Sequence, residues 1–188
     1  MYNISKNQCV GCGICENICS EGIEIKEGIA RIKDYSTKCL EKAVKACPQK
    51  AIKDITQDLF FAIGTDDNKT IKPDDHIGMS RYFQIWHYSS SNGNLVLRET
   101  RDNPKYAEDE TRVHGDPNKE KAVSSVLGNV DVLVGKMFGP NIVRLKRKYV
   151  CAVVRDSNIE TALELIKANI NEITDEYIKD ERKGIILH

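Results

Sequence analysis

Four cysteines close to the N-terminus are spaced as C-x2-C-x2-C-x3-C, and this spacing constrains the chain more than any other feature. The run is Cys9-Val-Gly-Cys12-Gly-Ile-Cys15-Glu-Asn-Ile-Cys19. An iron–sulfur cubane needs four thiolates at tetrahedral corners, and two-residue spacers let one tight loop present three of them. The first three cysteines of the run are therefore predicted to bind a [4Fe–4S] cluster.

The fourth thiolate has to come from a distant part of the fold. Cys47 fits this role because Pro48 follows it, as proline follows the remote ligand of this motif. Gly11 and Gly13 allow the loop to turn and leave amide N–H groups free to bond the cluster sulfurs. The alternative is a zinc site, but zinc sites usually pair two separated C-x2-C knuckles. The predicted ligands are Cys9, Cys12, Cys15 and Cys47.

With this run, residues 1–55 resemble bacterial-type ferredoxins, in whose two-cluster members each half supplies a complete run. Counting back from Cys47, the equivalent positions hold Ala43, Leu40 and Thr37, and none of these side chains is a thiolate. The resemblance therefore implies one low-potential cluster that carries one electron. Its expected apolar shell is Val10, Ile14, Ile18, Ile23, Ile32 and Ile52.

Two further cysteines, Cys19 and Cys39, have no place in a single cluster. Single-cluster ferredoxins with leftover cysteines in similar places can join them, so the resemblance implies a disulfide here. The alternative is a pair of buried free thiols. Loop closure favours the disulfide, whereas a reducing compartment opposes it. The sequence leaves both alternatives open.

The composition is that of an ordinary globular protein, with 40% hydrophobic and 30% charged residues among 188. The 28 Lys and Arg residues balance 28 Asp and Glu residues, so charge gives no case for nucleic acid or a membrane surface as a partner. No apolar run is long enough to span a bilayer, and the first residues lack the apolar core of a signal peptide. We expect a cytoplasmic protein, in which clustered cysteines are more typical of metal ligands than of structural bridges.

Six of the seven cysteines lie within the first 47 residues, and this asymmetry indicates two domains. We expect an α+β ferredoxin-like cluster domain over residues 1–56. Its elements are short helices that end at Cys19 and Cys47, and a β-hairpin that turns at Glu27-Gly28. Residues 57–188 are expected to form an α/β domain with a mixed sheet.

Alternating strands and helices are predicted along this second domain. Strands are expected near residues 59–63, 81–88, 94–101, 131–134 and 150–154, and helices near 117–127 and 140–149. A further helix is predicted to start at Ser157, because Glu160 three residues later completes a capping box. The charged tail, residues 175–183, is expected to be a solvated surface helix.

Several short pieces of the second domain resemble the family named for dinitrogenase iron–molybdenum cofactor biosynthesis. They are Phe61-Ala-Ile-Gly-Thr-Asp-Asp67, Asp75-His-Ile-Gly-Met-Ser-Arg-Tyr-Phe-Gln-Ile85, Asp131-Val-Leu-Val-Gly-Lys-Met-Phe-Gly-Pro140 and Ile159-Glu-Thr-Ala-Leu-Glu-Leu-Ile166. The resemblance covers most of residues 58–170, with Ile77-Gly78 where the family usually has Phe-Gly. It implies a ribonuclease-H-like α/β fold and a role in carrying or inserting iron–sulfur-based metal cofactors.

An anion site is predicted where Gly135 to Gly139 connect a strand to a helix, because N–H groups at a helix start attract anions. Lys136 lies in this loop, and thiolate-ligated clusters are anionic. The alternative is an ordinary turn beside a solvated basic face. His76 and His114 are candidate metal ligands or cluster contacts, and the alternative for each is a histidine that only caps or hydrogen-bonds.

No nucleophile–base constellation is evident, so we expect no enzymatic activity. Cys151 is expected to be a buried, inert thiol, and His87 a structural residue. A nuclease would need clustered carboxylates, whereas the aspartate pairs Asp66-Asp67 and Asp74-Asp75 are more typical of turns.

Two functions therefore stay open. One is a carrier or maturation factor whose second domain holds a transient iron–sulfur or other metal cofactor. The other is a plain electron-transfer ferredoxin whose second domain docks a partner. The expected partners are a redox protein and a donor or acceptor of the metal cofactor.

Overall fold

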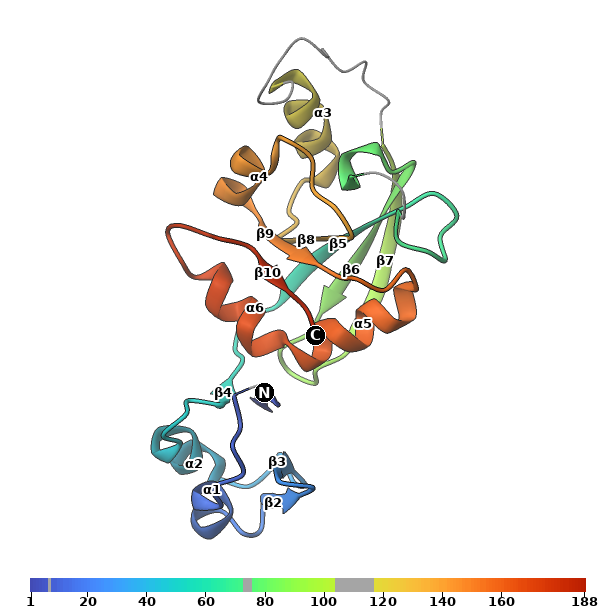
Figure 1. Cartoon of the computed structure of the whole chain (residues 1–188). Helices are drawn as coiled ribbons and strands as arrows, with labels where there is room; N and C mark the ends of the chain where they lie inside the picture. The colour runs from blue at the N-terminus through green and yellow to red at the C-terminus, as the bar shows by residue number, and fades with distance from the viewer. Residues whose placement is uncertain (7, 73–75, 104–116) are drawn as a thin grey trace.

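The computed structural model describes residues 1–6, 8–72, 76–103 and 117–188 (Figure 1). We call residues 1–56 the N-terminal module and residues 57–188 the C-terminal module, after the predicted boundary. No helix among the described residues is long and apolar enough to cross a membrane.

The N-terminal module consists of two short helices and two small antiparallel sheets. Its elements are β1 (Tyr2–Ile4), α1 (Ile14–Ile18), β2 (Ile23–Lys26), β3 (Ile29–Ile32), α2 (Leu40–Ala46) and β4 (Ile52–Asp54). Strands β2 and β3 form the predicted hairpin. Its two turn residues, Glu27 and Gly28, have φ values of 55° and 76°, as a two-residue type I′ turn requires.

The second small sheet joins the two ends of this module. Strand β1 pairs with β4, so that Tyr2 lies opposite Asp54 and Ile4 opposite Ile52. The amino group of Met1 also donates to the carbonyl of Ile55 at 2.7 Å. The sequence analysis missed this pairing because its strands have three residues each and no local turn connects them.

The C-terminal module is built on a six-stranded mixed sheet. Its elements are β5 (Leu59–Thr65), the 3-10 helix η1 (Ile77–Met79), β6 (Tyr82–Tyr88), β7 (Leu95–Asp102), α3 (Pro117–Leu127), β8 (Val132–Gly135), α4 (Ile142–Lys148), β9 (Val150–Val153), α5 (Ile159–Ala168), α6 (Ile170–Tyr177) and β10 (Ile185–Ile186). The strand order is β10-β9-β8-β5-β6-β7. Strands β5, β8, β9 and β10 run parallel, and β6 and β7 run antiparallel to their neighbours. A mixed α/β sheet was predicted and is observed.

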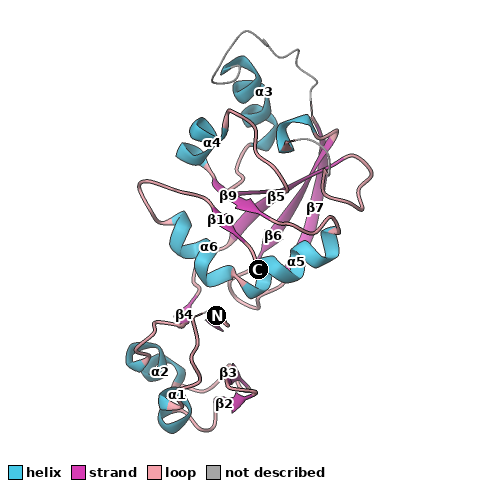
Figure 2. Cartoon of the chain, in the orientation of Figure 1, coloured by secondary structure: helices cyan, strands magenta, loops and turns pink. Residues whose placement is uncertain are grey.

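Helices cover both faces of this sheet (Figure 2). Along β5, Phe61 and Ile63 belong to the core beneath α5 and α6, whereas Ala62 belongs to the core beneath α3 and α4. This alternation follows from the two-residue period of a strand. Both faces of β5 are buried, which explains why its sequence is a continuous apolar run.

The predicted start of the helix after β9 was wrong by one residue. Asn158 is the N-cap of α5, and its Oδ1 accepts a hydrogen bond from the N–H of Glu160 at 2.7 Å. Ser157 lies one residue before the cap, and its Oγ instead accepts a hydrogen bond from Lys136 Nζ at 2.8 Å. Both side chains are acceptable N-caps, so the sequence did not distinguish them.

The prediction of a solvated surface helix over the charged tail, residues 175–183, is only partly right. Helix α6 ends at Tyr177, so most of this tail is not helical, and Glu176 is only 2% exposed. The Glu176 carboxylate accepts hydrogen bonds from the backbone N–H groups of Lys183 and Gly184, so it fixes the loop that leads to β10. Glu176 thus has a structural role that the charged composition of this segment did not indicate.

We expect Asn158→Ala to lower the free energy of unfolding by about 1 kcal/mol, since it removes the side-chain acceptor of the first free N–H of α5. Chemical denaturation followed by circular dichroism measures this change. Ser157→Ala is the matched comparison and should cost less. A larger cost for Ser157→Ala than for Asn158→Ala would show that Ser157 caps the helix.

Candidate functional site

All four predicted cluster ligands line one cavity of the N-terminal module. The cavity has a volume of about 330 Å3, including space open to solvent, and Cys9, Cys12, Cys15 and Cys47 lie on its wall. Cys15 sits in α1, and Cys47 is the C-cap of α2. Because the contacts between α1 and α2 hold these two helices together, the distant cysteine returns to the loop that presents the other three.

Glycine is required at two positions of the loop that carries Cys9, Cys12 and Cys15. Gly11 has a φ of +64°, and a Cβ at this position would lie 2.1 Å from the carbonyl oxygen of Gly28. Gly13, the N-cap of α1, has a φ of +78°. L-residues with side chains rarely adopt such backbone angles, so both glycines allow the loop to close round the cavity.

Two of the ligand sulfurs accept backbone hydrogen bonds. Ala30 N–H donates to Cys9 Sγ at 3.4 Å, and Ala51 N–H donates to Cys47 Sγ at 3.3 Å. Such bonds stabilise negative charge on sulfur and tune bound iron. The sequence analysis expected N–H groups of the glycine loop in this role, whereas these two donors come from β3 and from the residue before β4.

Four cysteine thiols are a donor set that would fit a [4Fe–4S] cubane, which takes one thiolate at each of its four iron atoms. Within the described residues, no group of three His, Cys, Asp or Glu side chains is arranged to hold one metal ion. Burial raises the pKa of the Cys15 thiol, and the thiolates of Cys9 and Cys47 raise it further, so a metal bound at this residue would have to displace a firmly held proton.

The predicted apolar shell is only partly right. Val10, Ile14 and Ile52 line the cavity, together with Ile25 and Ala30. Ile18, Ile23 and Ile32 are not among the lining residues: Ile23 is fully buried in the core of the module, and Ile18 is 39% exposed. On the open side, Cys12 is exposed and Val10 is 64% exposed, so this edge of the cavity faces solvent.

Cys19 and Cys39 are joined by a disulfide in the structure. Cys19 follows α1 and Cys39 is the N-cap of α2, so the bond ties the two helices that carry Cys15 and Cys47. Of the two alternatives that the sequence left open, the structure contains the disulfide.

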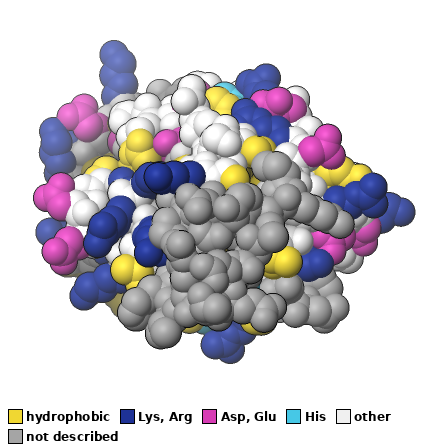
Figure 3. All heavy atoms as spheres, turned by 90° about the horizontal axis from the view of Figure 1, so that it is seen from above, with side chains coloured by type: hydrophobic (Ala, Val, Ile, Leu, Met, Phe, Trp, Pro, Cys, Tyr) yellow, Lys and Arg dark blue, Asp and Glu magenta, His cyan; other side chains and the backbone are white. Residues whose placement is uncertain are grey.

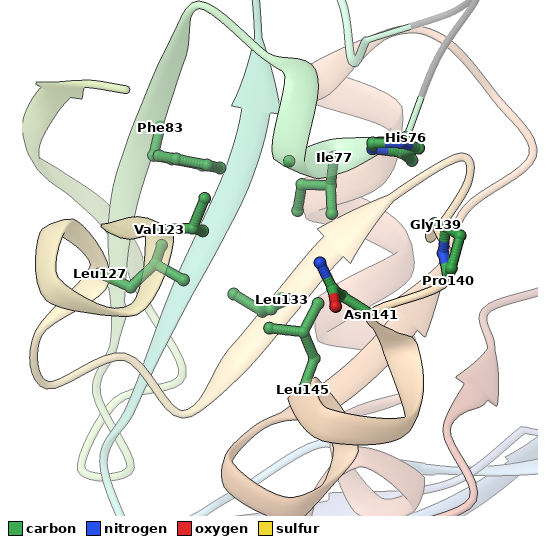
Figure 4. A pocket seen from close by; sticks show the side chains of 11 residues that line it. His76, Ile77, Phe83, Val123, Leu127, Leu133, Gly139, Pro140, Asn141 and Leu145 are labelled. Carbon is green, nitrogen blue, oxygen red and sulfur yellow. The ribbon is translucent and has the colours of Figure 1, made fainter. Parts of the chain in front are cut away.

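A second cavity lies in the C-terminal module, on the face of the sheet covered by α3 and α4. Its volume is about 480 Å3, including space open to solvent. Its lining residues are His76, Ile77, Gly78, Phe83, Val123, Leu127, Leu133, Gly139, Pro140, Asn141 and Leu145. Figure 4 shows His76 beside Gly139 and Pro140 at one end, whereas Val123, Leu127 and Phe83 lie at the other end. We call this cavity the His76 pocket.

The structure brings two of the predicted C-terminal contacts together. A Cβ at Gly139 would lie 2.6 Å from Cδ2 and 2.9 Å from Nε2 of His76, so the imidazole packs directly on this glycine. Gly135 lies beneath the side chain of Ile77, with Ile77 Cβ 3.2 Å from where its own Cβ would be. These contacts explain why glycine occupies both ends of the loop.

The other predicted contacts lie elsewhere. Lys136 is not a lining residue of the His76 pocket, because its Nζ donates to Ser157 on the other side of the loop. His114 lies outside the described residues. Lys and Arg side chains are spread among Asp and Glu over the face of the molecule that Figure 3 shows, rather than gathered there into a single basic patch.

The surroundings of three other residues, Cys151, His87 and Asp67, are typical of residues with a structural role. Cys151 is 1% exposed, and burial raises the pKa of its thiol to about 12, as expected for an inert cysteine. His87 Nε2 lies 2.9 Å from Asp58, and its Nδ1 lies 2.9 Å from Arg98. Hydrogen bonds from the backbone of Thr70 and Lys69 lower the pKa of Asp67 to about 2, as in a turn.

Most of the His76 pocket was not predicted from the sequence. Leu133 and Leu145 lie in a predicted strand and a predicted helix, but neither was expected to line a pocket, and Asn141 was not among the candidate site residues. Asn141 Oδ1 accepts a hydrogen bond from Arg144 at 2.8 Å. The i, i+4 spacing of Val123 and Leu127 indicates an apolar helix face, but such a pattern does not distinguish a pocket wall from a core.

Comparisons with known proteins address each module separately. The family described as dinitrogenase iron-molybdenum cofactor matches residues 58–169, which include the His76 pocket. A ferredoxin of Thermococcus litoralis is 30% identical over 53 residues, which are 27% of this chain and 90% of that protein.

We expect Gly139→Ala to lower the free energy of unfolding by about 1–3 kcal/mol, because the new methyl group overlaps the ring of His76. The backbone of Gly139 is not in the left-handed region, so the substitution tests packing alone. In a His76→Ala background the cost should fall by about 1 kcal/mol or more, as measured by a double-mutant cycle. If Gly139→Ala lowered the free energy of unfolding equally in the wild-type chain and in His76→Ala, the packing of His76 on Gly139 would be contradicted.

Proposed function

We propose that this chain, which belongs to the dinitrogenase iron-molybdenum cofactor family, carries or helps to assemble an iron–sulfur-based metal cofactor and binds one [4Fe–4S] cluster for electron transfer. A role in iron–molybdenum cofactor biosynthesis is what the family match supports. The similarity to a ferredoxin supports iron–sulfur binding. The cluster type, its number, and the ferredoxin-like and ribonuclease-H-like assignment of the two modules are part of the proposal.

The observation that carries the cluster assignment is the convergence of four cysteines on one cavity. Cys9, Cys12, Cys15 and Cys47 would hold the iron, and the N–H groups of Ala30 and Ala51 would stabilise charge on two of the sulfurs. A bound cluster would supply one-electron chemistry. The exposed edge at Cys12 and Val10 gives a partner protein access to that cavity.

The His76 pocket is the proposed place for the second cofactor. It lies within the residues that match the family and combines an imidazole with the amide of Asn141 and an apolar wall. Imidazole is a common ligand of transition metals. His76 carries the one imidazole among the described residues that line the pocket, so we infer that it is the residue that contacts the metal cofactor.

The two sites lie on opposite sides of the sheet. Phe83 and Leu133 of the pocket belong to the core beneath α3 and α4, whereas α6, which contacts the N-terminal module, lies on the other face. Stacked layers are about 10 Å apart, so the sheet and a helical layer separate the cluster from the pocket. We infer that the cluster exchanges electrons with a partner at its exposed edge rather than with the pocket of the same chain. A binding and electron-transfer role, without catalysis, completes the proposal.

The cluster assignment is tested by metal analysis of the full chain purified without oxygen. We expect about four iron atoms per chain in addition to any carried cofactor. Cys47→Ala should lose this iron, because only three thiolates then line the cavity. Cys151→Ala is the matched control and should keep it, since Cys151 lies buried in the C-terminal module. Zinc in place of iron, or full iron content in the Cys47 variant, would overturn the assignment.

The cargo assignment is tested on the same preparations. A carried cofactor would appear as iron or molybdenum beyond the four cluster irons, and His76→Ala should lose this excess while the cluster stays bound. His87→Ala is the control, because His87 bonds Asp58 and Arg98 and does not line the pocket. An excess that persists in the His76 variant would place the cargo elsewhere. The absence of any excess in the wild-type chain would favour a plain ferredoxin with a docking module.

A further inference from the structure

Helix α6 joins the two modules. Figure 1 places it between the sheet and the N-terminal module. Ile170 and Ile173 pack toward the sheet, while Asn171, Glu172 and Asp175 bond residues of the N-terminal module. Asn171 is fully buried. A buried amide has to find hydrogen-bond partners, so the partners of Asn171 fix how the two modules meet.

Asn171 holds the residue that donates to Cys47. Its Nδ2 donates to the carbonyl oxygen of Ala51 at 3.0 Å, and its Oδ1 accepts from the side chain of Asn3 at 3.1 Å. The N–H of Ser5 donates to the same Ala51 carbonyl at 2.8 Å. The N–H of Ala51 in turn donates to Cys47 Sγ. The carbonyl oxygen of Ala51 therefore accepts two hydrogen bonds, from Asn171 and from Ser5, while its N–H donates to the sulfur of Cys47.

Glu172 holds the segment that carries Cys9 in a similar way. Ser5 is fully buried, and its hydroxyl donates to Glu172 Oε1. The carbonyl of Ser5 accepts a hydrogen bond from the N–H of Cys9 at 3.0 Å. The hydroxyl also accepts a bond from the N–H of Gln8 at 3.3 Å. One serine therefore connects α6 to the backbone of a second ligand.

Within the described residues, the hydrogen bonds of α6 lead to the segments of Cys9 and Cys47 and not to those of Cys12 and Cys15. The first two are also the ligands whose sulfurs accept N–H bonds. The ion pair between Asp175 and Lys53 also crosses between the modules, but it lies on β4, beyond Ala51. It supplies an internal comparison, because it joins the modules without reaching a ligand segment.

We propose that Asn171 and Glu172 are positioning residues for the cluster, so that α6 of the C-terminal module helps to set its reduction potential. This inference rests on the proposed [4Fe–4S] cluster. A hydrogen bond from an N–H group to a thiolate is strongest when the cluster is reduced, because the reduced cluster carries more negative charge. Loosening Ala51 would lengthen this bond to Cys47 and make reduction less favourable. The potential of the cluster then depends on how the two modules are docked.

The experiment measures the midpoint potential of the full-length holoprotein by a redox titration followed by electron paramagnetic resonance. Asn171→Leu removes the amide, keeps the number and branching of the side-chain heavy atoms and changes no charge. We expect a shift to a more negative potential, of up to about tenfold in the reduction equilibrium, which is 59 mV for one electron. Asp175→Asn is the control and should titrate like the wild-type chain.

A second variant covers the case in which Asn171→Leu does not fold. Ser5→Ala also leaves the charge unchanged and removes the link between Glu172 and the Cys9 segment, so it should shift the potential in the same direction. Asn171→Gln keeps an amide and should lie nearer to the wild-type value than Asn171→Leu. Loss of iron from a folded Asn171→Leu protein, with iron retained in Asp175→Asn, also supports the proposal.

The two proposals fail in different ways. If the wild-type chain binds no iron–sulfur cluster, the proposed function fails and no potential can be compared. If every variant holds about four iron atoms and all titrate at the wild-type potential, the cluster assignment stands and the positioning role of α6 is overturned. An equal shift in Asp175→Asn would also overturn it, because docking in general, rather than these two residues, would then control the cluster.

Discussion

The return of Cys47 to the loop of Cys9, Cys12 and Cys15 is the constraint on which the rest of the N-terminal module depends. Few apolar side chains are buried in this small segment, and so short a segment cannot bury enough apolar surface to be stable without additional links. The structure supplies them through the disulfide between Cys19 and Cys39, through the pairing of β1 with β4, and through helix α6. Each of these links holds a helix or segment that carries, or lies next to, one of the predicted ligands.

The fold of the C-terminal module depends on a different constraint, which is the burial of its sheet between helices on both faces. Its central parallel strand β8 is buried on both faces, so every residue of β8 is apolar or glycine. At the loop that follows β8, the glycines at 135 and 139 make room for the side chain of Ile77 and the ring of His76. The His76 pocket therefore results from the packing of a rigid layer, and its shape depends on side chains that a strand or helix pattern places in the core.

Helix α6 connects the N-terminal and C-terminal modules. One side completes the core of the sheet and the other bonds Ser5 and the carbonyl of Ala51. Asn171, Glu172 and Asp175 of the helix bond the N-terminal module across this contact, and burying Asn171 without such partners would be costly. Because Asn171 and Glu172 also lead to the segments of Cys9 and Cys47, the contact that joins the modules is part of the surroundings of two predicted ligands. In the proposed function, the site of the cluster and the site of the carried cofactor therefore lie on modules that share this helix.

The sequence by itself determined the features that depend on local chemistry. The cysteine spacing and the Cys47-Pro48 pair identified four cysteines that line one cavity, and the pair Glu27-Gly28 identified a hairpin. Apolar and alternating runs located five of the six strands of the sheet, whereas the two-residue strand β10 was not predicted. Only the tertiary structure decided the pairing of β1 with β4, the packing of His76 on Gly139 and the role of Asn171. These contacts join residues far apart in the chain, and side chains such as asparagine and histidine form equally good hydrogen bonds with many partners. Their partners follow from the way the layers pack, which no local pattern records.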